Sequence, residues 1–445
     1  MTTNKMEVME IKKLVLTMSI PIMISMLVQA LYNIVDSMFV ARVSEDALAA
    51  VSLCSPIQTI MVAVACGTGV GINAMMSRYL GQHEQKKAQS VLCHGLILSV
   101  ISGIVFAILG LFGTTFFLNL FTHDSLIIQL GEEYLSICTS LSVFVFVQIA
   151  YERIMQATGH AFYNMIMQGV GALINIIFDP IFIFVLGFGV KGAAIATVLG
   201  QMIAMMIGIW ITNKKIKEVE VNFKDFSLNW IVIKEIYQIG VPAILIQSIM
   251  SFMTVFMNMI LIAYGALTVS VFGIYFKLST FIFMAVNGIN NALIPIVSFN
   301  YGARHFDRIF KAVRFSLLLT ICIMFLGTCL AWGMPDLLLA LFDASKQMLD
   351  IGIPAIRIIG LCFIPAGINV ILGAALQATG FSKASLMITL CRQLVFLIPL
   401  SYVLMNLFGL EIGWSAFVIT ETLCMLISLA FYRRTCNQIQ RIERV

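Results

Sequence analysis

The sequence predicts an all-α polytopic membrane protein, with 12 transmembrane helices in two six-helix lobes related by a pseudo-twofold axis along the membrane normal. Of the 445 residues, 60% are hydrophobic and only 11% are charged, whereas roughly a quarter of an ordinary soluble domain is charged. Long apolar runs recur along the chain, and the second half of the sequence repeats the first. So little charge cannot solvate a water-facing surface of this size, which excludes a soluble globular protein.

Each predicted helix is a predominantly apolar run of about 20 residues or more, the length that crosses a bilayer. The runs cover 14–40, 48–74, 90–117, 131–155, 162–187, 191–212, 235–262, 267–294, 311–334, 349–376, 383–408 and 411–432. We therefore expect an N-terminal lobe over 1–212, a cytoplasmic connector over 213–234 and a C-terminal lobe over 235–445. The connector is too short for a catalytic or nucleotide-binding domain, and no phosphate-binding GxxxxGK[ST] loop occurs in the sequence.

Lysine and arginine set the expected orientation. Outside the predicted spans they gather on the connectors that share a side with both termini, and the opposite side has only Arg42, Lys191 and Lys346. Because basic connectors stay in the cytoplasm, we expect a multi-pass protein of the cell membrane with both termini cytoplasmic. Membrane topology accounts for the net charge of +5, so the lipid bilayer is the expected partner and nucleic acid is not. We expect a monomer.

An internal repeat appears when the sequence is aligned with itself so that Pro21 meets Pro242. At this one offset Gly81 meets Gly302, and the Gln-Ala-Thr-Gly of 156–159 meets the identical segment of 377–380. Glycine directly after a helix favours a left-handed turn, so tight turns are expected at both segments. Each half has an even number of spans and enters the membrane from the same side. This is the parallel-repeat plan of transporters that bind substrate between their halves.

Polar side chains of the first half are predicted to form a cation site. Asp36, Asn175, Asp179 and Thr197 lie on three different spans, and at about 1.5 Å per residue Asp36, Asp179 and Thr197 reach similar depths below the outer surface. Pro180 lacks an N–H and frees a carbonyl oxygen nearby. Oxygen ligands of this kind suit Na⁺ or a shared proton; alternatively, neighbours satisfy each acid and the acids only fix helix packing. The polar candidates for a substrate cleft in this half are Gln29, Tyr32, Asn33, Gln168 and Gln201.

The second half does not repeat this site, because Asp36 aligns with Met257 and Asp179 with Leu400. Ion coupling is therefore expected in the first half alone. The second half has its own intramembrane ionisable residues, and we expect Glu421 to pair with one or more of the three cations, as a structural clamp or as a gate. The candidates for cleft or gate in this half are Gln247, Ser251, Thr254, Asn258, Lys277, Met284, Arg357, Arg392 and Glu421.

These residues resemble those of the multidrug and toxic compound extrusion (MATE) transporters, and especially the DinF-like and MepA-like branch. The resemblance covers essentially the whole chain and rests on Pro21 with Asp36, Asn175 with Asp179 and Pro180, Thr197, the paired Gln-Ala-Thr-Gly turns and the Asn-Tyr-Gly-Ala-Arg of 300–304. It implies a V-shaped pair of six-helix lobes that exports amphipathic cationic compounds by alternating access.

The resemblance also implies antiport against H⁺ or Na⁺, with no other cofactor. It implies that Asp36, Asn175, Asp179 and Thr197 hold the coupling cation and that Pro21 lets the first helix bend; Pro180 is a second hinge candidate. The eighth span lacks an acidic residue and has Lys277 instead, so a sodium site in the second lobe is not expected.

Two other function classes compete with multidrug export. A flippase for lipid-linked oligosaccharides or phospholipids could share this architecture, and Lys277, Arg357 and Arg392 would then engage an anionic head group. An intramembrane enzyme is not expected, because the histidines lie in connectors or near span ends and no HExxH motif is present.

Overall fold

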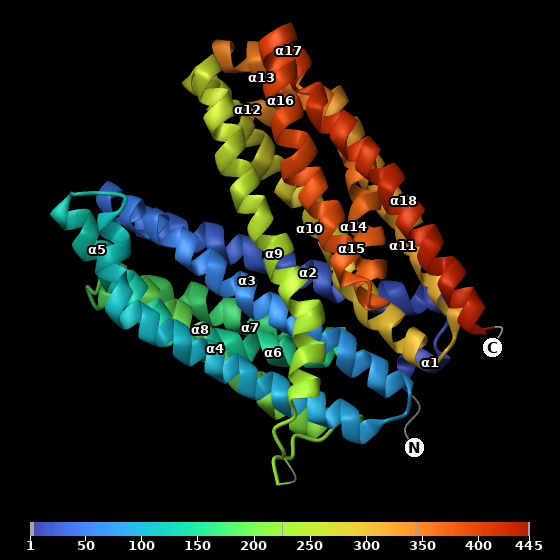
Figure 1. Cartoon of the computed structure of the whole chain (residues 1–445). Helices are drawn as coiled ribbons and strands as arrows, with labels where there is room; N and C mark the ends of the chain where they lie inside the picture. Colours follow the sequence, from blue (N-terminus) through green and yellow to red (C-terminus); the bar gives the residue numbers. More distant parts are fainter. Residues whose placement is uncertain (1–3, 225, 343–344, 444–445) are drawn as a thin grey trace. The chain divides into compact units, whose positions relative to one another are not determined.

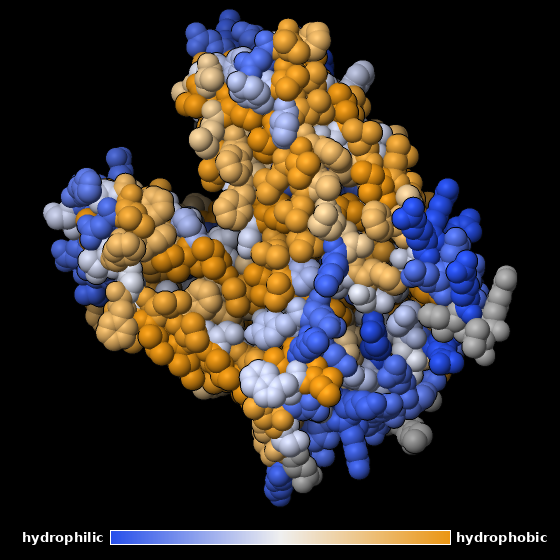
Figure 2. Space-filling view, in the orientation of Figure 1, coloured by the Kyte–Doolittle hydropathy of each residue, from blue (hydrophilic) through white to orange (hydrophobic). Residues whose placement is uncertain are grey.

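The computed structural model describes residues 4–224, 226–342 and 345–443, and these are helical almost throughout (Figure 1). Ten of the described helices are long and apolar enough to cross a membrane, and there are up to 12 spans if each of two bent helix pairs is one span. The predicted all-helical polytopic fold is confirmed. Figure 2 shows apolar side chains along the long helices and hydrophilic side chains gathered around helix ends, the pattern of a surface solvated by lipid.

The helices of the first half begin with the short α1 (Lys5–Val8). The others are α2 (Ile11–Ala41), α3 (Glu45–Gly81), α4 (Gln85–Asn119), α5 (Ser125–Ser140), α6 (Val143–Ala157), α7 (Ala161–Pro180) with the π-helix η1 (Ile181–Val185), and α8 (Val190–Lys215).

The second half begins with α9 (Trp230–Leu261) and the short 3₁₀ turn η2 (Ile262–Tyr264). The others are α10 (Ala266–Gly302), α11 (Phe306–Gly333), α12 (Pro335–Ala340), α13 (Lys346–Gly360), α14 (Phe363–Ala378), α15 (Ser382–Leu390), the π-helix η3 (Cys391–Phe396), α16 (Leu397–Phe408), α17 (Leu410–Gly413) and α18 (Ser415–Glu443).

Two predicted spans are broken rather than straight. The fourth consists of α5 and α6, which meet at a bend of 49°, and the tenth consists of α13 and α14, which meet at 46°. Pro365, in the first turn of α14, has no N–H to continue the helix from α13. Hydroxyl groups link both breaks to a neighbouring helix: Ser142, at the first break, donates to the carbonyl oxygen of Gly103 in α4 at 2.8 Å, and Thr328 of α11 donates to that of Gly360, at the second break, at 3.0 Å.

The internal repeat extends to individual contacts. α3 and α10 begin at the aligned residues Glu45 and Ala266 and end at the aligned residues Gly81 and Gly302. Ser77 donates its hydroxyl to the carbonyl oxygen of Ala157 at 3.1 Å, and its copy Ser298 donates to that of Ala378 at 3.1 Å. The two halves therefore use one helical plan, and residues that the repeat aligns occupy equivalent places within their own halves.

The turns after α3 and α10, and those after α6 and α14, are also copied. His83 and Arg304 both adopt a left-handed backbone, with φ of 58° and 57°. Gly159 and Gly380 have φ of 83° and 96°, so the tight turns predicted at the Gln-Ala-Thr-Gly segments are confirmed.

The chain forms two compact units, and two helices, α2 and α9, are each divided between them. Unit 1 comprises residues 1–8 and 24–244, and unit 2 comprises 9–23 and 245–445. The N-terminal part of α2 thus packs within unit 2, and the N-terminal part of α9 packs within unit 1. Each changeover comes two residues after a proline inside the helix, Pro21 in α2 and Pro242 in α9. These prolines interrupt the helical hydrogen bonds where the chain passes from one unit to the other.

The connector before α9 is packed onto unit 1. His94 of α4 is buried, accepts the backbone N–H of Asn229 on Nε2 at 2.9 Å and lies 4.8 Å from the ring of Phe226. Near the other end of the connector, Glu218 lies 4.0 Å from His160. Burial lowers the pKa of the His160 imidazole, with Glu218 acting in the opposite direction. The described residues near both ends of the connector therefore contact unit 1.

The copied left-handed residues give a test of the fold. A non-glycine residue in this conformation costs about 1–2 kcal/mol, so His83→Gly should be neutral or stabilise the protein by up to about 1 kcal/mol, because glycine also gains unfolded-state entropy. His83→Val should destabilise it, because a β-branched residue strongly resists positive φ. Thermal unfolding of the purified protein in detergent measures both effects, and Arg304→Gly and Arg304→Val should reproduce the pattern. A valine variant as stable as the glycine variant would contradict the turn.

Candidate functional site

Within unit 1, the four residues of the predicted cation site come together from three helices. Asp179 of α7 is 0% exposed and Asn175, one turn earlier, is 2% exposed, while Asp36 of α2 is half-buried. Thr197 of α8 completes the group. The amide nitrogen of Asn175 lies 3.3 Å from the Thr197 hydroxyl and 3.5 Å from Asp179 Oδ1.

The Asn175 amide links Asp179 to α8 in either of its two orientations. With the amide flipped, so that its oxygen and nitrogen exchange places, the nitrogen donates to Asp179 Oδ2 at 3.2 Å and the oxygen accepts the backbone N–H of Thr197 at 3.2 Å. The flipped orientation satisfies both ends of the amide, and we prefer it for that reason. Asn175 therefore holds the Asp179 carboxyl group at a defined position against α8.

The carboxyl groups of Asp36 and Asp179 lie within hydrogen-bonding distance of each other. A hydrogen bond between two carboxyl groups requires a proton on one of them, because two carboxylates have only acceptors. Asp36 Oδ1 is buried and has no hydrogen-bond partner among the described residues. The pair can therefore share a proton, or its free oxygen can take part in binding a small cation.

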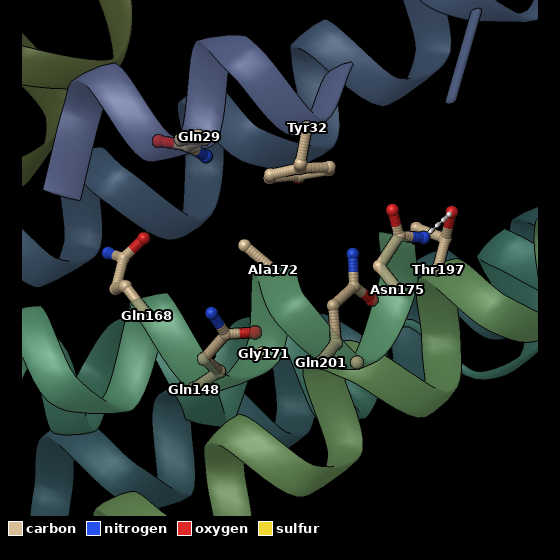
Figure 3. A pocket seen from close by; sticks show the side chains of 10 residues that line it. Gln29, Tyr32, Gln148, Gln168, Gly171, Ala172, Asn175, Thr197 and Gln201 are labelled. Atoms are coloured by element: carbon tan, nitrogen blue, oxygen red, sulfur yellow. Dashed lines mark hydrogen bonds between the residues drawn. The ribbon is translucent and has the colours of Figure 1, made fainter. Parts of the chain in front are cut away.

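A polar cavity adjoins this pair, between α2, α6, α7 and α8 (Figure 3). It has about 340 Å³ of empty space, part of which is open to solvent. Half of its lining residues carry a side-chain amide. The lining consists of Gln29, Tyr32, Gln148, Gln168, Gly171, Ala172, Asn175, Thr197, Gly200 and Gln201.

Two glycines let α7 and α8 approach closely beside this cavity. A Cβ atom on Gly200 would lie 2.7 Å from the carbonyl oxygen of Gly171, and one on Gly171 would lie 3.0 Å from the carbonyl oxygen of Gly200. Helices packed this closely need residues without side chains at the crossing. The same absence of side chains leaves room for the cavity.

Some predicted residues of the first half lie apart from the cavity lining. Asn33 is exposed on α2, and its carbonyl oxygen accepts the Ser37 hydroxyl at 2.8 Å. Pro180 is the last residue of α7, directly before the π-helix η1. Pro21 lies in the part of α2 that belongs to unit 2.

The second half brings only one of its three cations to the predicted acid. Arg392 Nη1 lies 3.4 Å from Glu421 Oε2, so the expected ion pair of Glu421 is confirmed for this partner. Lys277 is exposed with its Nζ 5.9 Å from the centre of the Phe342 ring, and Arg357 is exposed near the end of α13. Neither forms a salt bridge with Glu421 within the described residues.

The remaining candidates of the second half are spread along α9 and α10. Thr254 donates its hydroxyl to Met250 of its own helix at 3.0 Å. Gln247 and Ser251 are exposed, while Asn258 and Met284 are half-buried. No hydrogen bond joins these four side chains to another helix in the part of the chain that the structure describes.

The sequence reasoning missed the contribution of α6. Gln148 lines the cavity, and Glu152 accepts hydrogen bonds from Gln168 at 2.5 Å and from Gln156 at 3.0 Å. Buried Arg153 donates to the other side of Gln156 at 3.2 Å. The spacing of Gln148, Glu152 and Gln156 places all three on one helical face, and this polar stripe was the signal that could have found them.

The membrane-spanning repeats and the polar cavity beside two buried acids define a multi-pass membrane transporter. A family model described as MatE matches residues 21–181 and matches again over 242–403. These two matches cover most of the sequence, and the chain belongs to the MatE family. The matches start at Pro21 and Pro242, the two prolines that the internal repeat aligns. Membership of this transporter family also confirms that the protein is not an enzyme.

Similar proteins of known name are multidrug exporters. The chain is 26% identical over 425 residues to the multidrug export protein MepA of Staphylococcus haemolyticus, covering 94% of this chain and 92% of that protein. It is 26% identical over 435 residues to MepA of Staphylococcus aureus, with the same coverage. The predicted resemblance to the MepA-like branch is confirmed.

Solved structures of the family share the fold. An outward-facing multidrug resistance MATE transporter of the MOP superfamily matches with a TM-score of 0.93 at 26% identity, over 99% of both chains. A MATE in complex with MaL6 also matches with a TM-score of 0.93, at 26% identity over 98% of this chain and 99% of that one. A MOP superfamily transporter from Pyrococcus furiosus, described as having a binding pocket of reverse polarity, matches with a TM-score of 0.92 at 26% identity, over 98% of both chains.

The glycine contact beside the cavity is testable by adding one methyl group. Gly200→Ala would place its Cβ against the Gly171 carbonyl and should destabilise the protein by about 1–3 kcal/mol, because two backbones would have to separate. The matched control is Gly169→Ala, since nothing lies within 4 Å of a Cβ there and alanine has the higher helix propensity. Thermal unfolding in detergent compares the two, and equal stability of both variants would contradict the close packing of α7 against α8.

Proposed function

We propose that this protein is a secondary active exporter that exchanges amphipathic cationic compounds for H⁺ or Na⁺ by alternating access. Asp36, Asn175, Asp179 and Thr197 are the proposed site of the coupling cation. The observation that carries the proposal is the placement of two carboxyl groups within hydrogen-bonding distance of each other, next to a polar cavity. The exporter names of the MepA relatives support the direction of transport and the class of substrate.

Antiport follows if the negative charge of the Asp36 and Asp179 pair can be neutralised either by the coupling ion or by the transported cationic compound. Two carboxylates this close repel each other strongly in a low-dielectric interior, so the pair retains a bound positive charge. A proton or Na⁺ at the pair reduces the attraction for a cationic compound in the adjoining cavity, and a bound compound reduces the affinity for the ion by the same factor. Ion entry from outside then drives the release of the compound.

The donor set is compatible with Na⁺ as well as with a proton. Na⁺ is a hard cation and prefers oxygen ligands. The Asp36 and Asp179 carboxylates, the Asn175 amide oxygen and the Thr197 hydroxyl would hold it, and the unpartnered Asp36 Oδ1 provides a free ligand atom. Its charge would replace the shared proton between the two acids.

The cavity offers groups suited to an amphipathic cation. Tyr32 presents an aromatic ring, which attracts cations over its face, and the amides of Gln29, Gln168 and Gln201 can bind the polar atoms of varied compounds (Figure 3). The residues of the second half proposed to line the substrate path are Gln247, Ser251, Thr254, Asn258, Lys277, Met284 and Arg357.

The hinge proposed at Pro21 is supported by the division of α2 between the units. The helix leaves unit 2 after Met23 and enters unit 1 at Ile24, and the preceding proline removes a hydrogen bond that would stiffen it. Two similar solved structures are described as MATE in the bent conformation and in the straight conformation. Pro180, followed by the π-helix η1, is proposed as a second place where a helix yields.

The proposed setting is the cell membrane, with both termini in the cytoplasm and the protein acting as a monomer. In this orientation Asp36 and Asp179 lie in the outer halves of their helices, so the coupling ion enters from outside. The membrane potential contributes about 2.3 kcal/mol per elementary charge per 100 mV to such inward movement.

A second candidate function is a flippase for lipid-linked oligosaccharides or phospholipids. Lys277 and Arg357 favour it, because both are exposed on helices in the membrane and neither has a salt-bridge partner among the described residues. A flippase of this kind would bind an anionic lipid precursor in preference to a cationic dye, and Lys277→Gln with Arg357→Gln would abolish that binding. Binding of the dye but not of the lipid precursor supports the exporter.

The coupling pair is tested with Asp36→Asn and Asp179→Asn. In everted membrane vesicles carrying each variant, transport of a cationic dye should fall to the level of vesicles without the protein, because the substituted site can no longer gain and lose a positive charge. The control is Asp350→Asn, at an exposed position of α13. Imposing first a pH gradient and then a Na⁺ gradient identifies the ion. Wild-type rates in both site variants would rule the pair out.

The hinge is tested with Pro21→Ala, which restores a helical N–H. We expect dye transport to slow several-fold while dye binding to the purified protein is retained, since the change affects the conformational step and not the cavity. Pro56→Ala is the matched control, because Pro56 is exposed inside α3 and far in sequence from either changeover. Unchanged transport by Pro21→Ala, or an equal loss in Pro56→Ala, would contradict the hinge.

A further inference from the structure

The internal repeat equates the cavity of unit 1 with a buried ion pair of unit 2. The offset that aligns Pro21 with Pro242 pairs the cavity residues Gln148, Gly171 and Gly200 with Asn369, Arg392 and Glu421. In unit 1 the residues at these positions line the cavity. In unit 2 they carry the side chains of a single hydrogen-bonded group.

The contacts of this group are known atom by atom. Glu421 Oε2 accepts from Asn369 Nδ2 at 2.9 Å and from Arg392 Nη1 at 3.4 Å. Asn369 also donates to the backbone carbonyl of Glu421 at 3.1 Å, and its own oxygen accepts the Ser428 hydroxyl at 2.8 Å. The side chains of Arg392 and Glu421 are only 12% and 11% exposed. Asn369 and Ser428 therefore fix the carboxylate, whereas Arg392 reaches it through one long bond.

Arg392 is held less tightly than a buried guanidinium usually is. Such a group has five donors, yet its one described hydrogen bond is 3.4 Å long and its buried Nε has no partner among the described residues. The guanidinium is therefore less fully hydrogen-bonded than a buried structural arginine. Arg392 lies in the π-helix η3. Short π-helical segments within α-helices frequently mark functional sites.

An aromatic cluster begins one helical turn from this carboxylate. Phe417 precedes Glu421 by four residues on α18, and its ring meets that of buried Tyr275 edge to face at 6.0 Å. The Tyr275 ring stacks on Phe363 at 6.4 Å. An anionic carboxylate fixed by an amide and near aromatic rings is the chemistry that binds flat organic cations.

We propose that unit 2 contains a latent site for aromatic organic cations, formed by Glu421, Asn369 and Ser428, and that Arg392 is its built-in occupant. The guanidinium supplies the positive charge that the carboxylate requires, from a position whose copy lines the cavity of unit 1. Binding of external cations is thereby confined to one of the two copies. The inference concerns binding alone and does not depend on which ion drives transport.

Removing the Arg392 side chain tests the proposal directly. Arg392→Gly is combined with Asp36→Asn and Asp179→Asn, so that cation binding in unit 1 does not contribute, and the protein in detergent is titrated with benzamidine. We expect calorimetry to show one new benzamidine site per chain and a rise in Tm with ligand, neither of which occurs with Arg392 present. Adding Glu421→Gln should abolish both effects. Arg433→Gly, at an exposed position of α18, is the matched control.

The choice of probe separates a latent site from a simple structural ion pair. Methylguanidinium should fill the hole left by any buried arginine, whereas benzamidine requires the additional room and the aromatic surroundings of a copied cavity. Binding of methylguanidinium without benzamidine would overturn the proposal, as would benzamidine binding that survives Glu421→Gln. If Arg392→Gly folds poorly, its yield in size-exclusion chromatography should recover when benzamidine is present during expression and purification. Recovery with methylguanidinium alone would contradict the proposal.

Discussion

A buried carboxylate in a membrane protein needs a positive charge close by, and this requirement organises both units. In unit 1, Asp36 and Asp179 lie within hydrogen-bonding distance of each other and have no basic side chain among their described partners. In the proposed mechanism their compensating charge comes from a proton or from a cation that can leave. In unit 2, Glu421 receives its positive charge from Arg392, which is part of the chain. The positive charge near the carboxylates is thus proposed to be exchangeable in unit 1, whereas in unit 2 it is a permanent part of the chain.

The repeat explains why this difference could arise without changing the fold. The ends of α3 and α10, the turns that follow them and the serine bonds of Ser77 and Ser298 are the same in both copies, because they satisfy backbone groups that every membrane helix must satisfy. Side chains that face the cavity do not have to satisfy backbone groups. Gly171 and Gly200 allow close helix packing beside the cavity of unit 1, whereas their counterparts Arg392 and Glu421 pair with each other in unit 2. The two halves therefore share a backbone arrangement but differ in the side chains at these positions.

Much of this could be predicted from the sequence, because bilayer thickness and periodicity are local signals. The spans, the repeat, the turns at Gly159 and Gly380, and the partnership of Glu421 with a cation follow from spacing and charge. The bends within the fourth and tenth spans could not be predicted in this way, because a long apolar run has the same composition whether its helix is straight or broken. The cavity residue Gln148 and the acid Glu152 were also missed, because α6 meets α7 only through tertiary packing. Lys277 and Arg357 share their depth with Arg392, but only the fold shows that they lie on other faces.

The exchange of helix halves connects local charge to large-scale motion. α2 carries Asp36 in its unit 1 part, while its first turns belong to unit 2, and Pro21 lies just before the changeover. A change of charge at Asp36 alters the force on a helix that is anchored in both units and weakened at one point between them. α9 has the same division after Pro242, but Met257 replaces the acid at the position that matches Asp36. Both α2 and α9 are divided between the units after a proline, but only α2 has an acid at this position, so the coupling ion is expected to act through α2 alone.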